Sequence, residues 1–194
     1  MNDWSVSEFT APQDDLISLQ EAKEHLHVTN TKEDALIASQ ITAAREWIES
    51  YIGYVTVKRT LKLSLDSFPS GDTITLPRSK LLSIESVEYV DRDGDTQIWA
   101  AENYTADTDS VEGRLIRNPD TDWPETKSQR QAVQIKYVAG YEDVASIPGS
   151  IKSACKILVA DFHLHRESVV VGTITAQVPM SALSLLHPHR RMYL

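Results

Sequence analysis

The chain has 194 residues, of which 41% are hydrophobic and 24% charged, proportions that are ordinary for a globular protein. Its net charge of -9 argues against strong overall affinity for nucleic acid, because phosphate binding requires clustered lysine and arginine. The single cysteine, Cys155, excludes an intramolecular disulfide and a cysteine-based zinc site. No apolar stretch approaches the roughly 20 residues of a membrane span, and residues 1–15 lack a signal-peptide core, so no membrane partner is expected.

The first segment, residues 1–16, is expected to form an N-terminal arm. Serine, threonine and aspartate dominate it, Pro12 interrupts it, and Trp4 and Phe9 are its candidate anchors. Such a composition at a chain end favours a segment that is disordered or becomes ordered on a partner.

Two helices are predicted next. Ser18 to Glu21 has the spacing of a capping box, which predicts a short helix up to about His27. A longer helix is predicted to begin near residues 31–34 and to end at Gly53, a residue type typical of helix C-termini. Its buried face is predicted from residues at spacings of three and four: Ile37, Ile41, Ala44, Ile48 and Ile52. Three polar residues are expected to lie off this face: Glu33, Gln40 and Glu49.

The middle of the chain changes to a period of two. This alternation predicts strands over residues 56–66, 73–76, 82–90, 96–99, 113–117 and 132–138. Within it, Asp93-Gly94 predicts a tight hairpin, because glycine accepts the positive φ of such turns. After the strands, an apolar stripe predicts a helix from Pro148 to about His165, with Ser150 as its cap. A last helical turn over residues 181–186 ends before Pro188.

The order of elements predicts an α+β fold. A small helical core, made of two N-terminal helices and a C-terminal helix, carries a β-rich insertion and an extended C-terminal tail. The expected boundaries are an arm at 1–16, the helical core at 17–53 and 142–177, the β-rich insertion at 54–141 and the tail at 178–194.

The residues that commonly carry chemistry are not arranged for it. Histidine pairs at a spacing of two (25/27, 163/165 and 187/189) separate their side chains on a helix, whereas metal-binding helices use a spacing of four. The loop Asp91–Asp95 has glycine in its fourth position, not the sixth that a calcium loop requires. The aspartate pairs 107/109 and 120/122 lie in probable loops and are expected to be solvated, and Cys155 is expected to be a buried thiol. No catalytic, metal-binding or cofactor-binding residue is therefore predicted.

The C-terminal tail is basic, unlike the rest of the chain. It carries the residues His187, His189, Arg190, Arg191, Met192, Tyr193 and Leu194. Arginine, tyrosine and methionine are enriched in protein interfaces, which favours a protein contact here. A frayed terminus and a contact to nucleic acid remain the alternatives.

Five blocks, taken in order, resemble the head–tail connector (head-completion adaptor) family of long-tailed phages. These blocks are residues 16–26 with 33–37 and 43–49, residues 76–77 with 82–91, residues 133–141, residues 147–152, and residues 166–172 with 185–186. The resemblance covers about residues 16–190 and leaves the arm unmatched.

The resemblance implies a structural protein of the virion neck, assembled in the host cytoplasm, without catalysis or cofactor. It implies a dodecameric ring between the portal protein and a tail-side connector or tail-completion protein, with DNA passing through the lumen without specific binding. In this family the C-terminal segment reaches the portal, so His187 and residues 189–194 are the expected portal-binding residues. The competing hypotheses are a metal-dependent hydrolase and a DNA-packaging accessory protein that uses Arg190 and Arg191.

Overall fold

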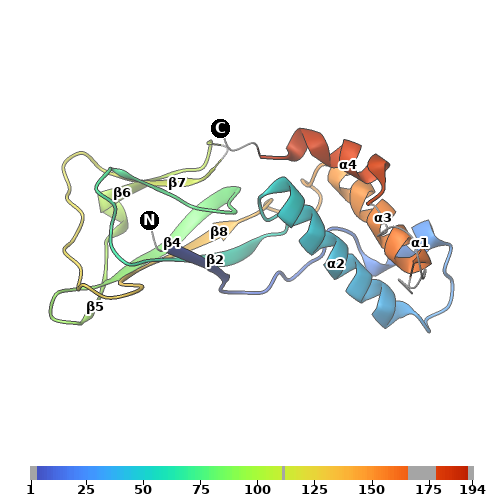
Figure 1. Cartoon of the computed structure of the whole chain (residues 1–194), viewed down its shortest axis with the longest axis horizontal. Helices are drawn as coiled ribbons and strands as arrows, with labels where there is room; N and C mark the ends of the chain where they lie inside the picture. The colour runs from blue at the N-terminus through green and yellow to red at the C-terminus, as the bar shows by residue number, and fades with distance from the viewer. Residues whose placement is uncertain (1–3, 111, 166–177, 192–194) are drawn as a thin grey trace, which may run out of the picture. The chain divides into compact units, whose positions relative to one another are not determined.

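The computed structural model describes residues 4–110, 112–165 and 178–191. The chain divides into two compact units that alternate along the sequence (Figure 1). The β-rich unit comprises Met1–Gln13 and Val57–Glu142, and the helical unit comprises Asp14–Thr56 and Asp143–Leu194. The combination of helices with antiparallel sheets confirms the predicted α+β class.

The helical unit is built around helix α3. Its elements are α1 (Leu19–Leu26), α2 (Asp34–Ile52), α3 (Gly149–Leu164), α4 (Met180–Leu186) and the 3-10 turn η2 (His187–His189). Helix α3 contacts each of the other three α-helices, so its apolar stripe forms the centre of this unit's core. Among the described residues, no helix combines the length and apolar character required to cross a membrane.

Local signals in the sequence set the ends of the first two helices as predicted. Ser18 Oγ accepts a hydrogen bond from the Glu21 backbone N–H at 3.1 Å, and Glu21 Oε2 accepts one from the Ser18 N–H at 2.9 Å. This capping box satisfies two donors that the helix itself leaves unpaired. Gly53 ends α2 with φ of 86°, a left-handed conformation that glycine adopts without steric cost.

The buried face of α2 is wider than predicted. The five predicted apolar residues are buried, but Gln40 and Glu49 are also only 8% and 3% exposed, so their placement off the face was wrong. Glu49 Oε1 accepts hydrogen bonds from both the N–H and the Oγ1 of Thr56, each at 2.8 Å. Arg45 lies beside it, with 3.7 Å between Arg45 Nη1 and Glu49 Oε2. These partners offset the loss of hydration that would otherwise keep a carboxylate at the surface.

Helix α3 begins without the predicted cap. Its N-cap position is Pro148, and no side chain accepts from the first turn. Ser150 lies inside the helix, where its Oγ is 2.7 Å from Nε2 of His189. The prediction of Ser150 as a cap was wrong because this hydroxyl takes a distant partner.

The β-rich unit contains two antiparallel sheets. The five-stranded sheet has the order β1-β2-β8-β4-β5, and the three-stranded sheet has the order β3-β7-β6. The strands are β1 (Trp4–Glu8), β2 (Arg59–Leu65), β3 (Thr73–Thr75), β4 (Leu81–Val90), β5 (Thr96–Ile98), β6 (Tyr104–Asp107), β7 (Arg114–Arg117) and β8 (Val133–Ala139). All strands predicted from the period of two are present, and the Asp-Gly hairpin joins β4 to β5. Strand β6 was not predicted, because its four residues show no clear alternation.

The N-terminal segment differs from the expectation of disorder. Residues Trp4–Glu8 form strand β1, which pairs with β2 from Trp4↔Leu65 to Glu8↔Leu61. A polar sequence can form an edge strand when an existing sheet supplies the hydrogen-bonding partner, and composition alone does not reveal that partner.

The core of the β-rich unit lies between its sheets. Strand β8 buries alternate side chains, whereas β2 is buried along most of its length. The buried Tyr137 of β8 donates a hydrogen bond from its hydroxyl to Pro77 O at 2.6 Å. An aromatic cluster extends this core: Phe68, Tyr89, Trp99, Tyr104 and Trp123. Ring centroids within it are 4.8 to 6.1 Å apart, the range in which aromatic pairs stabilise each other.

Candidate functional site

The C-terminal segment that was expected to contact a partner is folded onto the helical unit as far as it is described. Helix α4 buries Ala182 and Leu186 completely, and η2 follows it directly. His187 and Arg190 are exposed. The expected contact residues Met192, Tyr193 and Leu194 lie outside the described residues. This part of the tail therefore has its structure in the subunit itself.

Two arginines fix the end of this segment on helix α2. The backbone N–H of Arg191 donates to Ile52 O at 2.9 Å. The Arg191 guanidinium lies over the ring of Tyr54, with 4.9 Å from Cζ to the ring centroid. The Arg190 guanidinium lies 5.3 Å from the ring centroid of Tyr51. Each guanidinium thus contacts an aromatic ring of the helical unit, while Arg190 is exposed and Arg191 is partly exposed.

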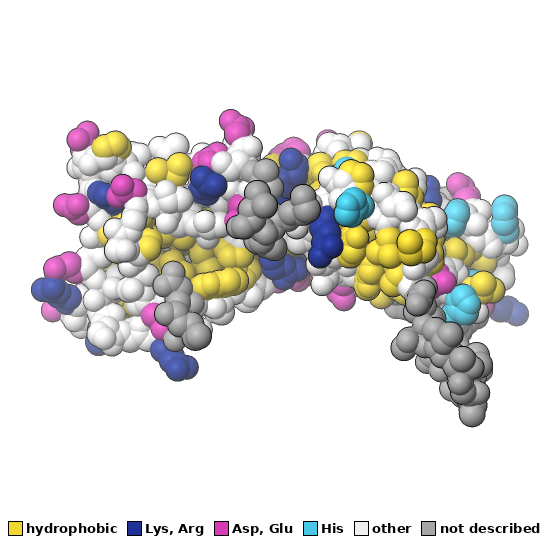
Figure 2. Space-filling view, turned by 45° about the horizontal axis from the view of Figure 1, so that its top comes forward, with side chains coloured by type: hydrophobic (Ala, Val, Ile, Leu, Met, Phe, Trp, Pro, Cys, Tyr) yellow, Lys and Arg dark blue, Asp and Glu magenta, His cyan; other side chains and the backbone are white. Residues whose placement is uncertain are grey.

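Hydrophobic side chains gather on the face of the helical unit that Figure 2 shows, with cationic and histidine side chains at the border of this patch. Two large apolar residues of this unit are strongly exposed: Leu164 at 77% and Met180 at 75%. A contiguous apolar surface with a charged border is the composition of a protein interface. Met180 is the first residue of helix α4, so the C-terminal segment itself contributes one of these exposed apolar side chains.

His163 and His165, at the end of helix α3, contact neighbouring polar side chains. His163 Nδ1 is 3.2 Å from Gln40 Oε1, and its Nε2 is 3.6 Å from Glu33 Oε2. His165 contacts Asp161 of the preceding turn. Over residues 4–110, 112–165 and 178–191, no group of three or more histidine, cysteine, aspartate and glutamate side chains is arranged to hold a metal ion.

The loop carboxylates are engaged in turns. Asp91 Oδ1 accepts backbone hydrogen bonds from residues 93, 94 and 95, and Asp91 Oδ2 accepts one from the Gln97 side chain. These bonds, with the Gln97 contact largest, lower the pKa of Asp91. The hydroxyl of Ser110 does the same for Asp107. A lowered pKa keeps both carboxylates ionised, whereas a general acid requires a raised one.

The single thiol is inert by its position. Cys155 is fully buried in helix α3. Burial raises its pKa to about 12, so the thiol stays protonated at neutral pH. Because the thiolate is the nucleophile, this environment fits the predicted structural thiol.

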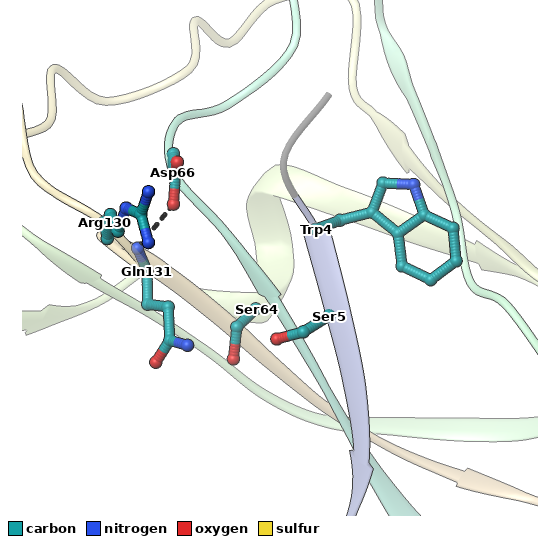
Figure 3. A pocket seen from close by; sticks show the side chains of 6 residues that line it. All are labelled: Trp4, Ser5, Ser64, Asp66, Arg130 and Gln131. Carbon is teal, nitrogen blue, oxygen red and sulfur yellow. Dashed lines mark hydrogen bonds between the residues drawn. The ribbon is translucent and has the colours of Figure 1, made fainter. Parts of the chain in front are cut away.

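A shallow hollow beside β1 is lined by Trp4, Ser5, Ser64, Asp66, Arg130 and Gln131 (Figure 3). Its volume is about 240 Å³. Asp66 accepts a hydrogen bond from the Gln131 backbone N–H at 2.7 Å, so this carboxylate holds the loop before β8. Figure 3 shows the side chains of Ser5 and Ser64 pointing into the hollow and that of Trp4 pointing away from them. The lining contains no histidine and no cysteine, and its one carboxylate, Asp66, is engaged by the Gln131 N–H.

The fold is shared with chains from gene transfer agent (GTA) particles. A chain from the neck of an empty GTA particle computed with C6 symmetry is 22% identical, with a TM-score of 0.82 over 98% of this chain and 97% of that chain. A chain from the virion of a native GTA particle is 21% identical, with a TM-score of 0.81 over 97% and 96%. A chain from the neck of a native GTA particle computed with C12 symmetry is 22% identical, with a TM-score of 0.80 over 98% and 97%. At these identities the similarity shows the fold.

The chain thus combines a two-unit α+β fold with a helical surface whose composition suits contact with another protein. Residues 15–192 match the head completion protein family, and the chain belongs to that family. Membership confirms the resemblance drawn from the sequence and the structural head–tail connector role that it implied. The match begins after strand β1, as the unmatched arm had indicated. No curated protein matches the chain in sequence.

Proposed function

We propose that the protein is a ring-forming connector subunit in the virion neck, seated between the portal protein and the tail or the next connector. The observation that carries this proposal is the family match over residues 15–192. The neck structures with the same fold are described with C12 and C6 symmetry, and a ring of twelve subunits is compatible with both. These symmetries support the dodecamer that the family resemblance implies. Assembly is proposed to take place in the host cytoplasm.

The two proposed protein partners are the portal protein and a tail-side connector or tail-completion protein. The C-terminal segment is the proposed portal contact: His187, His189, Arg190, Arg191, Met192, Tyr193 and Leu194. Exposure of His187 and Arg190, which follow directly after helix α4, supports this assignment. Arg191 and His189 are proposed to act by fixing the segment in place, since both contact the helical unit.

The division of the chain follows the same proposal. Residues 17–53 and 142–177 form the helical core, residues 54–141 form the β-rich insertion, and residues 178–194 carry the portal contact. Residues 1–16, which include strand β1, are proposed to act separately from the portal contact.

The proposed connector catalyses no reaction and takes no cofactor. The family match over residues 15–192 supports this proposal over a metal-dependent hydrolase. The net charge of -9 supports a channel in which DNA slides without specific binding, because acidic side chains repel the phosphate backbone. It argues equally against a DNA-packaging accessory protein.

Native mass spectrometry of the full chain, alone and mixed with the portal protein of the same particle, tests the proposal. We expect a closed multimer with the mass of twelve subunits, formed either alone or on the portal. A monomer or dimer that ignores the portal and retains a metal ion would instead support the hydrolase. Salt-dependent DNA binding by the same sample would support the packaging accessory protein.

A double variant tests the portal contact. His187→Ala combined with Arg190→Ala removes two exposed side chains, so we expect at least tenfold weaker binding to the portal with the fold unchanged. Lys32→Ala is the matched control, because it removes an exposed cation elsewhere on the helical unit. Equal binding by the double variant and the control would assign the portal contact to another surface. Truncation after Pro179 is less informative, because it also removes Ala182 and Leu186 from the core.

A further inference from the structure

Strand β1 is attached to its sheet mainly through its backbone. None of its five residues is buried, and only Val6 is as much as half-buried. Trp4 at the start of the strand and Phe9 just after it are each 53% exposed. Strand β1 is therefore held mainly by its backbone hydrogen bonds to β2. The same hydrogen bonds form whether β1 belongs to the same copy of the chain or to another copy.

Strand β2, on which β1 pairs, is held in the sheet by β8 on its other edge. Strand β2 pairs with β8 over seven residue positions and buries Leu61 and Leu63 in the core. The receiving edge also presents specific partners for the strand. Arg59 Nη1 donates to Glu8 Oε1 at 2.7 Å, and the Thr60 N–H donates to Thr10 Oγ1 at 3.0 Å. The edge of β2 therefore recognises the sequence of β1 in one register.

The connection between β1 and the helical unit is short. Thr10 is bonded to β2, whereas Asp15 pairs with Arg45 of helix α2 at 3.0 Å. Four residues, 11–14, join these anchors, and they span at most roughly 14 Å when extended. Pro12 is among them and favours an extended conformation in the residue before it. Exchange of a terminal element between copies keeps the contacts of the element itself and alters only such a connecting segment.

We infer that in the ring each subunit places its β1 on the β2 edge of the adjacent subunit. This inference rests on the proposed function, since it requires a ring. The exchange keeps every hydrogen bond and the Glu8–Arg59 ion pair, so it changes little in the energy of the strand itself. It also brings the half-exposed rings of Trp4 and Phe9 to a boundary between two copies, where tryptophan and other aromatics contribute strongly to binding. Each copy gives its strand to one neighbour and receives a strand from the other, so the contact is head-to-tail, the kind from which closed rings are built.

Crosslinking across the β1–β2 ladder tests the exchange. Ser5 and Ser64 are partners in this ladder, and Figure 3 shows both side chains pointing into the same hollow. The full chain carrying Ser5→Cys and Ser64→Cys is assembled into rings, with the portal protein where it is required. The rings are treated with a short bis-maleimide, denatured and weighed by mass spectrometry. The matched control carries Ser64→Cys and Gln134→Cys, since these partners lie in the β2–β8 ladder within one subunit.

Exchange predicts a covalent series of dimers, trimers and larger products from the test pair, and crosslinked monomers alone from the control pair. Crosslinked monomers from both pairs, in rings confirmed by native mass, would overturn the exchange while leaving the connector function intact. Failure to form any ring would contradict the proposed function and the exchange together. The native Cys155 does not interfere, because it is completely buried.

Discussion

The guanidinium of Arg191 lies over the ring of Tyr54, with 4.9 Å between its Cζ atom and the ring centroid. The backbone N–H of Arg191 also donates to Ile52 O, at the last residue of helix α2. A helix leaves its final carbonyls without intrahelical donors, so this bond satisfies one of them. The C-terminal segment is thus part of the helical unit and also the proposed portal contact.

The first prediction concerns this attachment. Arg191→Ala should lower the free energy of unfolding by about 1 kcal/mol, because it removes a cation from a tyrosine ring that is itself buried. Urea denaturation followed by far-UV circular dichroism measures the loss. Arg191→Lys should retain part of the stability that Arg191→Ala loses, because it keeps a cation near the ring, whereas the backbone hydrogen bond is present in both variants.

Arg190→Ala is the control for this prediction. Arg190 is exposed and lies over the half-buried ring of Tyr51, so its removal should cost about 0.5 kcal/mol or less. A larger loss from Arg190→Ala than from Arg191→Ala would contradict the assignment of Arg191 as the attachment point.

The second prediction concerns the buried carboxylate of helix α2. Glu49→Ala should lower the free energy of unfolding by about 3–5 kcal/mol, because it breaks a buried ion pair with Arg45. It also removes the acceptor for the N–H and hydroxyl of Thr56. Urea denaturation measures this loss as well.

Glu46→Ala provides a matched control for Glu49→Ala. Its carboxylate lies 4.0 Å from Nη2 of the same Arg45, but its side chain is 68% exposed. Exposed pairs contribute little, so the loss should stay below about 0.5 kcal/mol. Similar losses for the two variants would show that the Glu49 pair is screened by solvent, contrary to its burial.

The sequence predicted the features that depend on neighbours along the chain. The capping box at Ser18, the end of α2 at Gly53 and the apolar face of that helix all arise within one or two turns. The alternating strands followed from side-chain period in the same way. Glu49 was misplaced because its burial depends on Thr56, which lies beyond the end of the helix and comes beside Glu49 only in the packed unit.

Features that require distant partners were not predicted. Strand β1 exists because Trp4 comes opposite Leu65, and strand β6 because Tyr104 comes opposite Arg117. The contact of Arg191 with Ile52 joins the two sequence segments that make up the helical unit. Composition showed that the C-terminal segment is basic, but it gave no sign that part of this segment is packed in the subunit.

The third prediction concerns Cys155. Because burial raises the pKa of this thiol to about 12, the folded protein at pH 8 should react with iodoacetamide at least a hundredfold more slowly than the urea-unfolded chain. Mass spectrometry of the alkylated protein over time measures both rates. Comparable rates in the two states would show that the thiol is accessible and would reopen a reactive role for it.

The fourth prediction concerns pH. The ion pair between Lys136 and Glu88, 2.8 Å from Nζ to Oε1, lowers the pKa of Glu88 below its ordinary value of 4.5. A carboxylate with a lowered pKa in the folded state contributes stability above its unfolded pKa and loses it as the pH falls through the folded value. Glu88→Gln should therefore destabilise the protein by up to about 1 kcal/mol at pH 6, and the difference from the parent should shrink below pH 4.5.

Lys136→Met checks the cause of this pH dependence. Lys136 makes the largest contribution to the lowered pKa of Glu88. Without it, the protein should lose less stability between pH 6 and pH 3 than the parent does, as Glu88→Gln should also do. Urea denaturation at a series of pH values measures all three proteins. Parallel curves for the parent and Glu88→Gln would mean that this carboxylate titrates alike in the folded and unfolded states, contrary to the ion pair. A flatter curve for Glu88→Gln but not for Lys136→Met would assign the effect to the hydroxyl of Ser86, which also donates to Glu88.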